Sequence, residues 1–371
     1  MDTMEAETAT LYNLLGRHWT VGAPVTSTSF DPAGQAVAFA LADGALAIAP
    51  LTDIEPPQER YRMPLDGGRA TILPRRKPVP PLMKVIVSDV SPHLASLGTS
   101  GFTASDHGRL LHVSASGVTT LVANHGSAID LLAPVQDGGI LAASGATIIF
   151  YDSNGDVGWL QQRTGGDASA MAVSPDARRF ALGADDRLLI RTFGPRPEPA
   201  ASYEVGSVSA LSWSPDGRWL AAAVAKAGIV LVRLADARIV RLPNYPATVA
   251  SLSWSFDSRL LVTSGAYRIV AWDLSTLVGD NERPASLTTG RAGLVLAETV
   301  DTHPERSLVA AGYGDGRVVV SKIGEPEELV VKAAGRGGVQ ALRWSPDGQH
   351  LAFGTSDGDA AIVTFPPYIF K

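Results

Sequence analysis

The sequence predicts an all-β fold made of repeated four-stranded units, because one pattern of strands and tight turns occurs several times. Its clearest copy, residues 208–234, alternates apolar and polar residues, turns at Ser-Pro-Asp-Gly and continues as two apolar strands. Similar copies begin near residues 168, 249 and 339. A single unit of this kind cannot bury both of its faces, so each unit must pack against other copies.

The spacing of the copies predicts a single closed β-propeller. The turn residues Pro175 and Pro215 are 40 residues apart, and Phe256 follows Pro215 by 41 residues. The 90 residues from Phe256 to Pro346 leave room for one more copy around His303. A four-stranded repeat of about 40 to 45 residues is typical of propeller blades. We expect eight blades to fill the chain, with seven blades as the alternative.

The elements of the clearest copy follow from its local sequence. Val208–Trp213 alternates apolar and small polar residues, as a half-buried strand does. Ser214–Gly217 is a turn, because proline fixes φ, aspartate caps its own backbone and glycine accepts a positive φ. Trp219–Val224 is almost entirely apolar, which predicts a strand buried on both faces. Ile229–Leu234 and Arg238–Leu242 are expected as the third strand and the outer strand.

The amino-terminal part of the chain departs from the repeat. Residues 1–10 are expected to be flexible, and residues 11–24 to supply a ring-closing strand, at about Arg17–Val21, to the last blade. A terminal helix packed on the ring is the alternative. Residues 26–51 form the first unit. Residues 54–81 are rich in proline and are expected to be a long connecting loop, with a binding segment as the alternative.

The remaining units complete one domain that covers residues 11–371. The second unit, about Val85 to Ala123, is the least regular, and the count of blades depends on it. The later units are expected to start near Ala128, Ala168, Val208, Val249, Val295 and Val339.

Three short motifs resemble the repeats of the WD40 family. They are S-W-S-P-D-G at Ser212–Gly217, L-A-x-G-x-x-D-G at Leu351–Gly358, and the pair Trp272-Asp273 at the end of a third strand. The chain is identified as a diverged, bacterial-type member, because one copy alone has the Trp-Asp pair and none opens with Gly-His. The resemblance implies a propeller that acts as a scaffold. It also implies that the second turn of each blade and the entry to each first strand share one face around the central channel.

The composition excludes several classes of protein. Hydrophobic residues make up 45% of the chain and charged residues 18%, which is unlike an intrinsically disordered chain. The net charge of −6 disfavours binding to nucleic acid through phosphates, and the lack of cysteine excludes disulfides and thiolate metal sites. No apolar run reaches the roughly 18 residues of a membrane span, and the acidic start is unlike a secretory signal. We therefore expect a cytoplasmic monomer that binds neither nucleic acid nor membrane.

The sequence contains no recognisable catalytic motif. The seven histidines form no H-x-x-x-H pair, and no G-x-S-x-G, P-loop or dinucleotide fingerprint is present. Aspartate recurs at the turns, where its side chain accepts hydrogen bonds from nearby backbone amides and so stabilises the turn. We therefore expect no catalytic residue, cofactor or metal, and hence no enzyme. The alternative is a propeller that holds a metal or small ligand at the mouth of the channel, as a carrier or hydrolase.

Candidate binding residues are those that break the repeat. Lys226, Tyr267 and Arg268 stand at turns where other copies carry aspartate. The same face is expected to display Tyr245, His107, Asp186, Asp315 and Asp357. Mixed charge with tyrosine and arginine is typical of a protein-binding patch. These residues predict a protein partner, and solvated turns without a function are the alternative.

Overall fold

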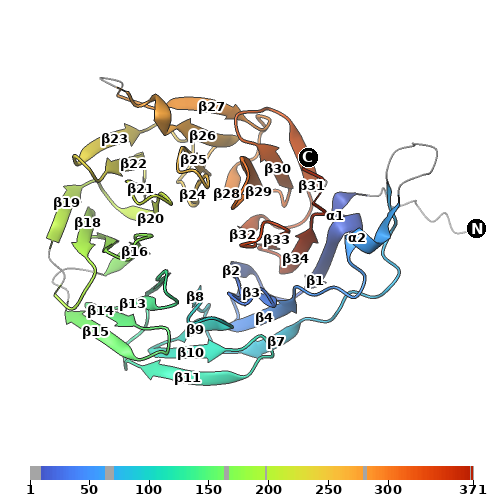
Figure 1. The fold of residues 1–371 in the computed structure, drawn as a ribbon, viewed down its shortest axis with the longest axis horizontal. Helices are drawn as coiled ribbons and strands as arrows, with labels where there is room; N and C mark the ends of the chain where they lie inside the picture. Colours follow the sequence, from blue (N-terminus) through green and yellow to red (C-terminus); the bar gives the residue numbers. More distant parts are fainter. Residues whose placement is uncertain are drawn as a thin grey trace, which may run out of the picture.

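Eight four-stranded antiparallel sheets form a closed ring in the computed structural model of this protein (Figure 1). The structure describes residues 10–62, 71–162, 167–196, 199–278, 282–367 and 369–370. The expected flexibility of residues 1–10 therefore concerns residues that, apart from residue 10, lie outside the described ones. The prediction of an all-β propeller with eight blades is confirmed, and the alternative of seven blades is wrong.

In seven blades the strands follow chain order from the channel to the rim, and the first strands of neighbouring blades contact one another around the ring. Blade 1 contains β2 (Val25–Phe30), β3 (Ala36–Leu41), β4 (Ala45–Pro50) and β7 (Met83–Ile86). Blade 2 contains β8 (Leu94–Ala95), β9 (Phe102–Asp106), β10 (Arg109–Val113) and β11 (Thr119–Asn124). Blade 3 contains β12 (Leu131–Pro134), β13 (Ile140–Ser144), β14 (Thr147–Tyr151) and β15 (Val157–Gln162). Blade 4 contains β16 (Ala168–Val173), β17 (Arg179–Ala184), β18 (Arg187–Thr192) and β19 (Pro199–Glu204).

The second half of the ring is the more regular. Blade 5 contains β20 (Val208–Trp213), β21 (Trp219–Val224), β22 (Gly228–Arg233) and β23 (Arg238–Leu242). Blade 6 contains β24 (Leu252–Trp254), β25 (Leu260–Thr263), β26 (Ile269–Asp273) and β27 (Ala285–Thr289), with a 3₁₀ turn, η1 (Leu274–Thr276), after β26. Blade 7 contains β28 (Ala297–Thr302), β29 (Leu308–Tyr313), β30 (Val318–Lys322) and β31 (Glu328–Lys332). Blade 8 contains β32 (Val339–Trp344), β33 (His350–Thr355), β34 (Asp359–Thr364) and β1 (Gly16–Thr20).

Blade 8 is completed by the amino-terminal part of the chain. Strand β1 pairs antiparallel with β34, with Thr20 opposite Asp359, and so supplies the outer strand of the last blade. The strand starts one residue earlier than the expected Arg17–Val21. A short helix, α1 (Leu11–Leu15), precedes it and packs against blade 8, so a strand and a helix are both present. In the described part of the chain no helix is long and apolar enough to cross a membrane.

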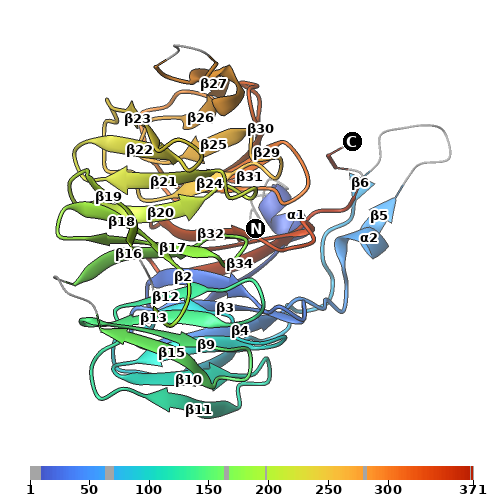
Figure 2. The same ribbon diagram turned by 60° about the vertical axis from the view of Figure 1, so that its left-hand side comes forward.

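The proline-rich segment 54–81 is an insertion within blade 1. It contains α2 (Pro57–Arg60), β5 (Tyr61–Arg62) and β6 (Thr71–Ile72), and it projects from the ring (Figure 2). After the insertion the chain returns as β7, which pairs with β4. The expectation that the second unit starts at Val85 is therefore wrong. Val85 lies on the outer strand of blade 1 because it pairs with Leu46 of β4. The apolar pattern around Val85 does not show to which blade it belongs.

The core lies between neighbouring blades. The second strand of blade 5, Trp219–Val224, is buried at every position, as predicted. Trp213, Trp254 and Trp344 are 7%, 6% and 5% exposed, which confirms that they are buried. Trp213 Nε1 donates to a carbonyl of blade 4, and Trp254 Nε1 donates to a carbonyl of blade 5. Each of these two indoles therefore ties its own blade to the preceding one.

The Ser-Pro-Asp-Gly turn is held by its own side chains. In blade 5 the Ser214 hydroxyl donates to Asp216 Oδ1 over 2.6 Å and accepts from the amide of Trp219 over 2.9 Å. Gly217 has φ of +67°, a conformation that favours glycine. The same serine–aspartate bond recurs in blades 4, 6 and 8. Local sequence therefore explains why the repeat is visible in the chain.

Candidate functional site

One face of the ring carries the turns in which Lys226, Tyr267 and Arg268 replace the aspartate of other copies. Because the strands of a blade are antiparallel, the turn between the second and third strands lies at the same end as the connection to the next blade. We call this end of the ring the connection face. It contains the seven turn residues predicted to bind a partner, namely His107, Asp186, Lys226, Tyr267, Arg268, Asp315 and Asp357. The eighth, Tyr245, lies in the connection between β23 and β24.

The turn of blade 5 is unfavourable for the residue that it contains. The amide of Ala227 donates to the carbonyl of Val224 over 3.1 Å, and Lys226 stands third in this turn with φ of +61°. That position favours glycine or asparagine, because a Cβ atom is crowded there. The lysine side chain is exposed. Turn chemistry therefore does not explain why lysine occupies this position.

The other predicted residues differ in how freely they face solvent. Tyr267 is 47% exposed, and Asp186 is also exposed. Arg268 is half-buried. Asp315 accepts a bond from the amide of Arg317 over 3.1 Å, and Asp357 lies 3.7 Å from the guanidinium of Arg336.

Tyr245 packs against blade 6 and does not project into solvent. Its hydroxyl accepts a bond from Trp272 Nε1 over 2.8 Å and lies 2.8 Å from Thr263 Oγ1. Burial raises the pKa of Tyr245 to about 12, although the hydrogen bonds to Thr263 and Trp272 oppose the shift. The phenol thus holds the connection between blades 5 and 6 in place.

A cavity of about 370 Å³ brings two of the predicted residues together. Tyr245 and Arg268 both line it, with Trp272 of β26 and Arg283 just before β27. The sequence pattern did not indicate the last two as site residues. Trp272 was interpreted as a marker of the repeat, and Arg283 lies outside the repeat pattern. We call this space the inter-blade cavity.

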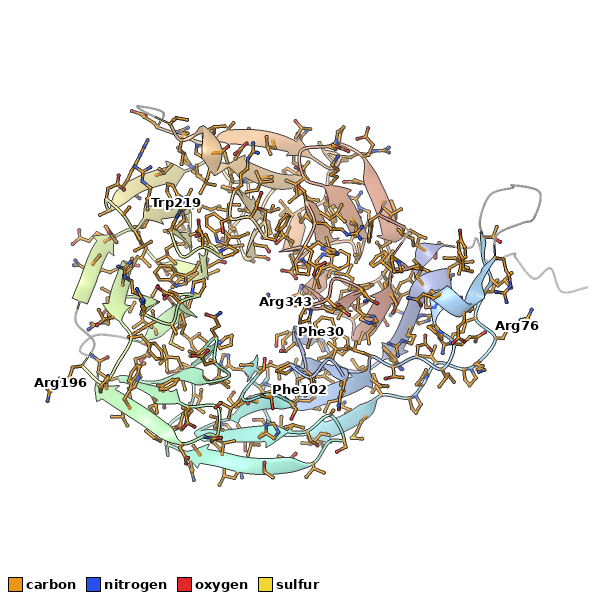
Figure 3. The ribbon with its side chains drawn as sticks, viewed as in Figure 1. Phe30, Arg76, Phe102, Arg196, Trp219 and Arg343 are labelled. Carbon is orange, nitrogen blue, oxygen red and sulfur yellow. The ribbon has the colours of Figure 1, made fainter. Side chains whose placement is uncertain are left out.

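The central channel has a second group of polar residues, which the sequence did not indicate. A space of about 290 Å³ is lined by the first strands of five blades, and Arg343 lies at the inner edge of the ring (Figure 3). Asp301 is 15% exposed and accepts bonds from the Trp344 amide over 2.8 Å and from Ser253 Oγ over 3.2 Å. Burial raises the pKa of Asp301, and Arg343, 3.9 Å away, opposes that shift.

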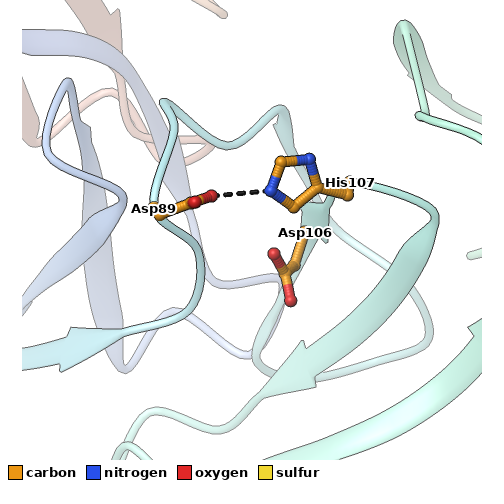
Figure 4. Close-up of side chains that lie close together, drawn as sticks. All are labelled: Asp89, Asp106 and His107. Carbon is orange, nitrogen blue, oxygen red and sulfur yellow. Dashed lines mark hydrogen bonds and ion pairs between the residues drawn. The ribbon is translucent and has the colours of Figure 1, made fainter.

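Three side chains between blades 1 and 2 have the spacing of metal ligands. Ligand atoms of Asp89, Asp106 and His107 all lie within 4.8 Å of one another, a grouping that occurs once among the described residues (Figure 4). His107 Nε2 is 2.6 Å from Asp89 Oδ1, and Asp106 is bonded to Arg109. Asp89 and His107 are thus partners of each other, and the group forms a hydrogen-bonded cluster with Arg109.

Comparison with known proteins agrees with this geometry. The family model described as WD domain, G-beta repeat matches residues 199–231 and 329–362. Two segments of the chain are therefore similar to WD40 repeats. Each match starts at the outer strand of one blade and continues through the first three strands of the next, so the WD40 repeat crosses the boundary between blades.

Two relatives share part of the sequence. A serine-threonine kinase receptor-associated protein of Gallus gallus is 26% identical over 49% of this chain and 51% of its own length. The protein of the same name from Dictyostelium discoideum is 29% identical over 30% of this chain and 36% of its own length. The chain thus spans about half, or less, of the length of the curated relatives that it matches.

Solved structures share the fold. The Pan2 WD40 domain of Neurospora crassa covers 96% of this chain and 97% of its own, with a TM-score of 0.59 and 12% identity. A chain in the crystal structure of a mitotic checkpoint complex covers 74% of this chain and 89% of its own, with a TM-score of 0.57 and 14% identity. At these identities the likeness concerns the WD40 propeller fold alone.

Proposed function

We propose that this WD40-repeat propeller is a non-enzymatic, cytoplasmic scaffold of bacterial type that presents its connection face to a protein partner as a monomer. Support comes from the names of its relatives, which are receptor-associated proteins, and from a structural neighbour that belongs to a multiprotein complex. The absence of cysteine is compatible with a reducing compartment. Cell fractionation tests the compartment, and light scattering of the purified chain tests the monomer.

One observation carries the proposal. Lys226, Tyr267 and Arg268 lie in the equivalent turns of two consecutive blades, on the connection face. Lys226 occupies a left-handed conformation that favours another residue type, and Tyr267 exposes a large aromatic ring. Tyrosine and arginine are enriched at binding hot spots, because each combines a large contact area with directed hydrogen bonds. Contact with a partner explains these residues, whereas turn formation does not.

The test is a triple variant, Lys226→Ala, Tyr267→Ala and Arg268→Ala, in the full chain. We expect it to keep its melting temperature and to lose the protein that co-purifies with the parent, identified by mass spectrometry. The matched control is Arg178→Ala, Arg218→Ala and Phe256→Ala, three exposed residues in the first turns of blades 4 to 6, on the opposite face.

Two results would contradict the proposal. The first is a partner retained at unchanged affinity by the triple variant, in which case the insertion of residues 54–81 becomes the next candidate surface. The second is an equal loss of the partner from the control variant, which would place binding on the opposite face.

A further inference from the structure

We propose that the inter-blade cavity binds an acidic segment of a protein partner, with an apolar side chain in the cavity and carboxylates on Arg241, Arg268 and Arg283. The idea of a protein partner rests on the proposed function, and the chemistry of the segment is inferred from the cavity itself. Three features of the cavity carry the inference, namely its apolar wall, its size and its charge.

Part of the cavity wall is apolar. Pro243, Tyr245 and Pro246 of the connection line the cavity together with Trp272 and Leu287 of blade 6. The Trp272 indole N–H is bonded to the Tyr245 hydroxyl, which in turn lies within bonding distance of Thr263 Oγ1. The polar atoms of both rings are thus satisfied within the protein, so the rings offer apolar surface to a ligand.

The size of the cavity suits a side chain of a partner. Its volume of about 370 Å³ falls within the range of roughly 300 to 1,000 Å³ that is common for ligand pockets. It lies next to the start of blade 5's third strand, because Gly228 packs against Leu242 and Tyr245, which both line the cavity. A chain segment that crosses the connection face can therefore place one large apolar side chain here.

Two arginines line the inter-blade cavity, and Arg241 lies in the space that adjoins it. Arg268 and Arg283 line the inter-blade cavity, and Arg283 also lines an adjoining space of about 320 Å³ together with Arg241. None of the three side chains forms a hydrogen bond or ion pair with another described residue. By contrast, Arg233 is paired with Asp236, and Arg259 is paired with Asp273.

The charge of this region is opposite to that of the whole chain. The net charge is −6, and Glu282 is the one acidic residue among those that line the two spaces. Arginine recognises carboxylates through paired hydrogen bonds of fixed geometry, and such bonds are stronger than those between neutral groups. Charge complementarity therefore selects a segment rich in aspartate and glutamate.

The experiment uses the full chain and a library of nine-residue peptides. The central position holds Phe, Tyr, Trp, Leu, Ile or Met, and the other positions are drawn from Asp, Glu, Gly and Ser. A matched library replaces Asp and Glu with Asn and Gln, and a third replaces the central residue with Ser. We expect enrichment from the acidic library alone, and we expect the affinity of an enriched peptide to fall as the salt concentration rises.

Two variants assign the binding to the cavity. Arg241→Gln combined with Arg283→Gln is expected to weaken an enriched peptide at least about tenfold, since two charge-assisted contacts are lost. Ser286→Trp, at an exposed position on the rim, is expected to weaken it similarly by filling the space. The control pair is Arg76→Gln and Arg196→Gln, two exposed arginines on the insertion and at the rim of blade 4 (Figure 3). We expect the control pair to leave the affinity unchanged.

Three outcomes overturn the inference. They are no enrichment of the acidic library, binding that the cavity variants leave unchanged, and binding by phosphoserine peptides alone. The variants share no residue with the triple variant that tests the proposed function. The two proposals can therefore fail separately. If the triple variant loses the co-purifying protein but acidic peptides are not enriched, the proposed scaffold function is supported and the proposed acidic segment is ruled out.

Discussion

Arg17 of the ring-closing strand donates a hydrogen bond of 3.0 Å from its Nη2 to the main-chain carbonyl of Leu51, at the end of β4 in blade 1. Its Nη1 donates to the carbonyls of Pro50 and Thr52 over 2.7 and 3.1 Å, and the side chain is 1% exposed. One arginine therefore ties the outer strand of the last blade to the first blade.

Arg17→Met is expected to destabilise the whole ring. The variant keeps much of the side-chain volume but leaves the main-chain carbonyls of Pro50, Leu51 and Thr52 without their donor and removes the positive charge beside Asp53. Removal of one partner from a buried, hydrogen-bonded charge costs about 3 to 5 kcal/mol. Urea denaturation measures the change, and Arg178→Met, at a side chain that is 84% exposed, serves as the control. A loss below about 1 kcal/mol would show that ring closure does not depend on Arg17.

Truncation of the inter-blade tryptophans tests the packing between blades. Trp213→Ala, Trp254→Ala and Trp344→Ala are each expected to lower the free energy of unfolding by about 3 to 5 kcal/mol, because each leaves a cavity in the core. Phe256→Ala removes an aromatic ring that is 49% exposed and is the control. Similar small losses at all four positions, measured by chemical denaturation, would contradict the assigned packing.

Lys226→Gly is expected to stabilise the protein by about 0.5 to 1 kcal/mol, because the left-handed conformation is strained for lysine and free of strain for glycine. Thr120→Gly on the exposed outer strand β11 is the matched control and is expected to destabilise by about 0.5 to 1 kcal/mol. Thermal unfolding of both variants gives the comparison. If Lys226→Gly lowers the melting temperature, the lysine contributes to the fold and the argument for its role in binding fails.

Asp301→Asn tests the buried carboxylate in the channel wall. Burial raises the pKa of Asp301 in the folded state, so the folded protein holds this proton more tightly than the unfolded chain does. Stability is therefore lost as the pH rises from the ordinary aspartate pKa of about 4 through the raised value. The free energy of unfolding of the variant, minus that of the parent, should increase with pH across this interval.

Asp236→Asn is the control of opposite sign. The hydrogen bond from Arg233 lowers the pKa of Asp236 to about 2, so this carboxylate stabilises the fold above its unfolded pKa and the effect is lost as the pH falls. The difference between Asp236→Asn and the parent should therefore become more negative as the pH rises. A pH-independent difference for Asp301→Asn would show that its carboxyl titrates normally.

Features that depend on neighbouring residues in the chain were predictable from the sequence. The Ser214–Gly217 turn is held by hydrogen bonds between residues at most five apart in the chain. The strand Trp219–Val224 is almost entirely apolar, and this composition predicted that it is buried. These local rules predicted eight blades and the phase of the strands in blade 5, whereas the start of the second unit at Val85 was wrong. They also placed Lys226, Tyr267 and Arg268 in turns on one face.

Only the tertiary structure decided which distant segments meet. Met83–Ile86 is the outer strand of blade 1 because it pairs with the free edge of β4 after the insertion. The apolar residues of Met83–Ile86 do not by themselves specify this pairing. Tyr245 met Trp272 because the connection between blades folds back over blade 6. Hydrogen bonds within a turn act over a few residues of the chain, whereas a cavity forms between elements that only the closure of the ring brings together.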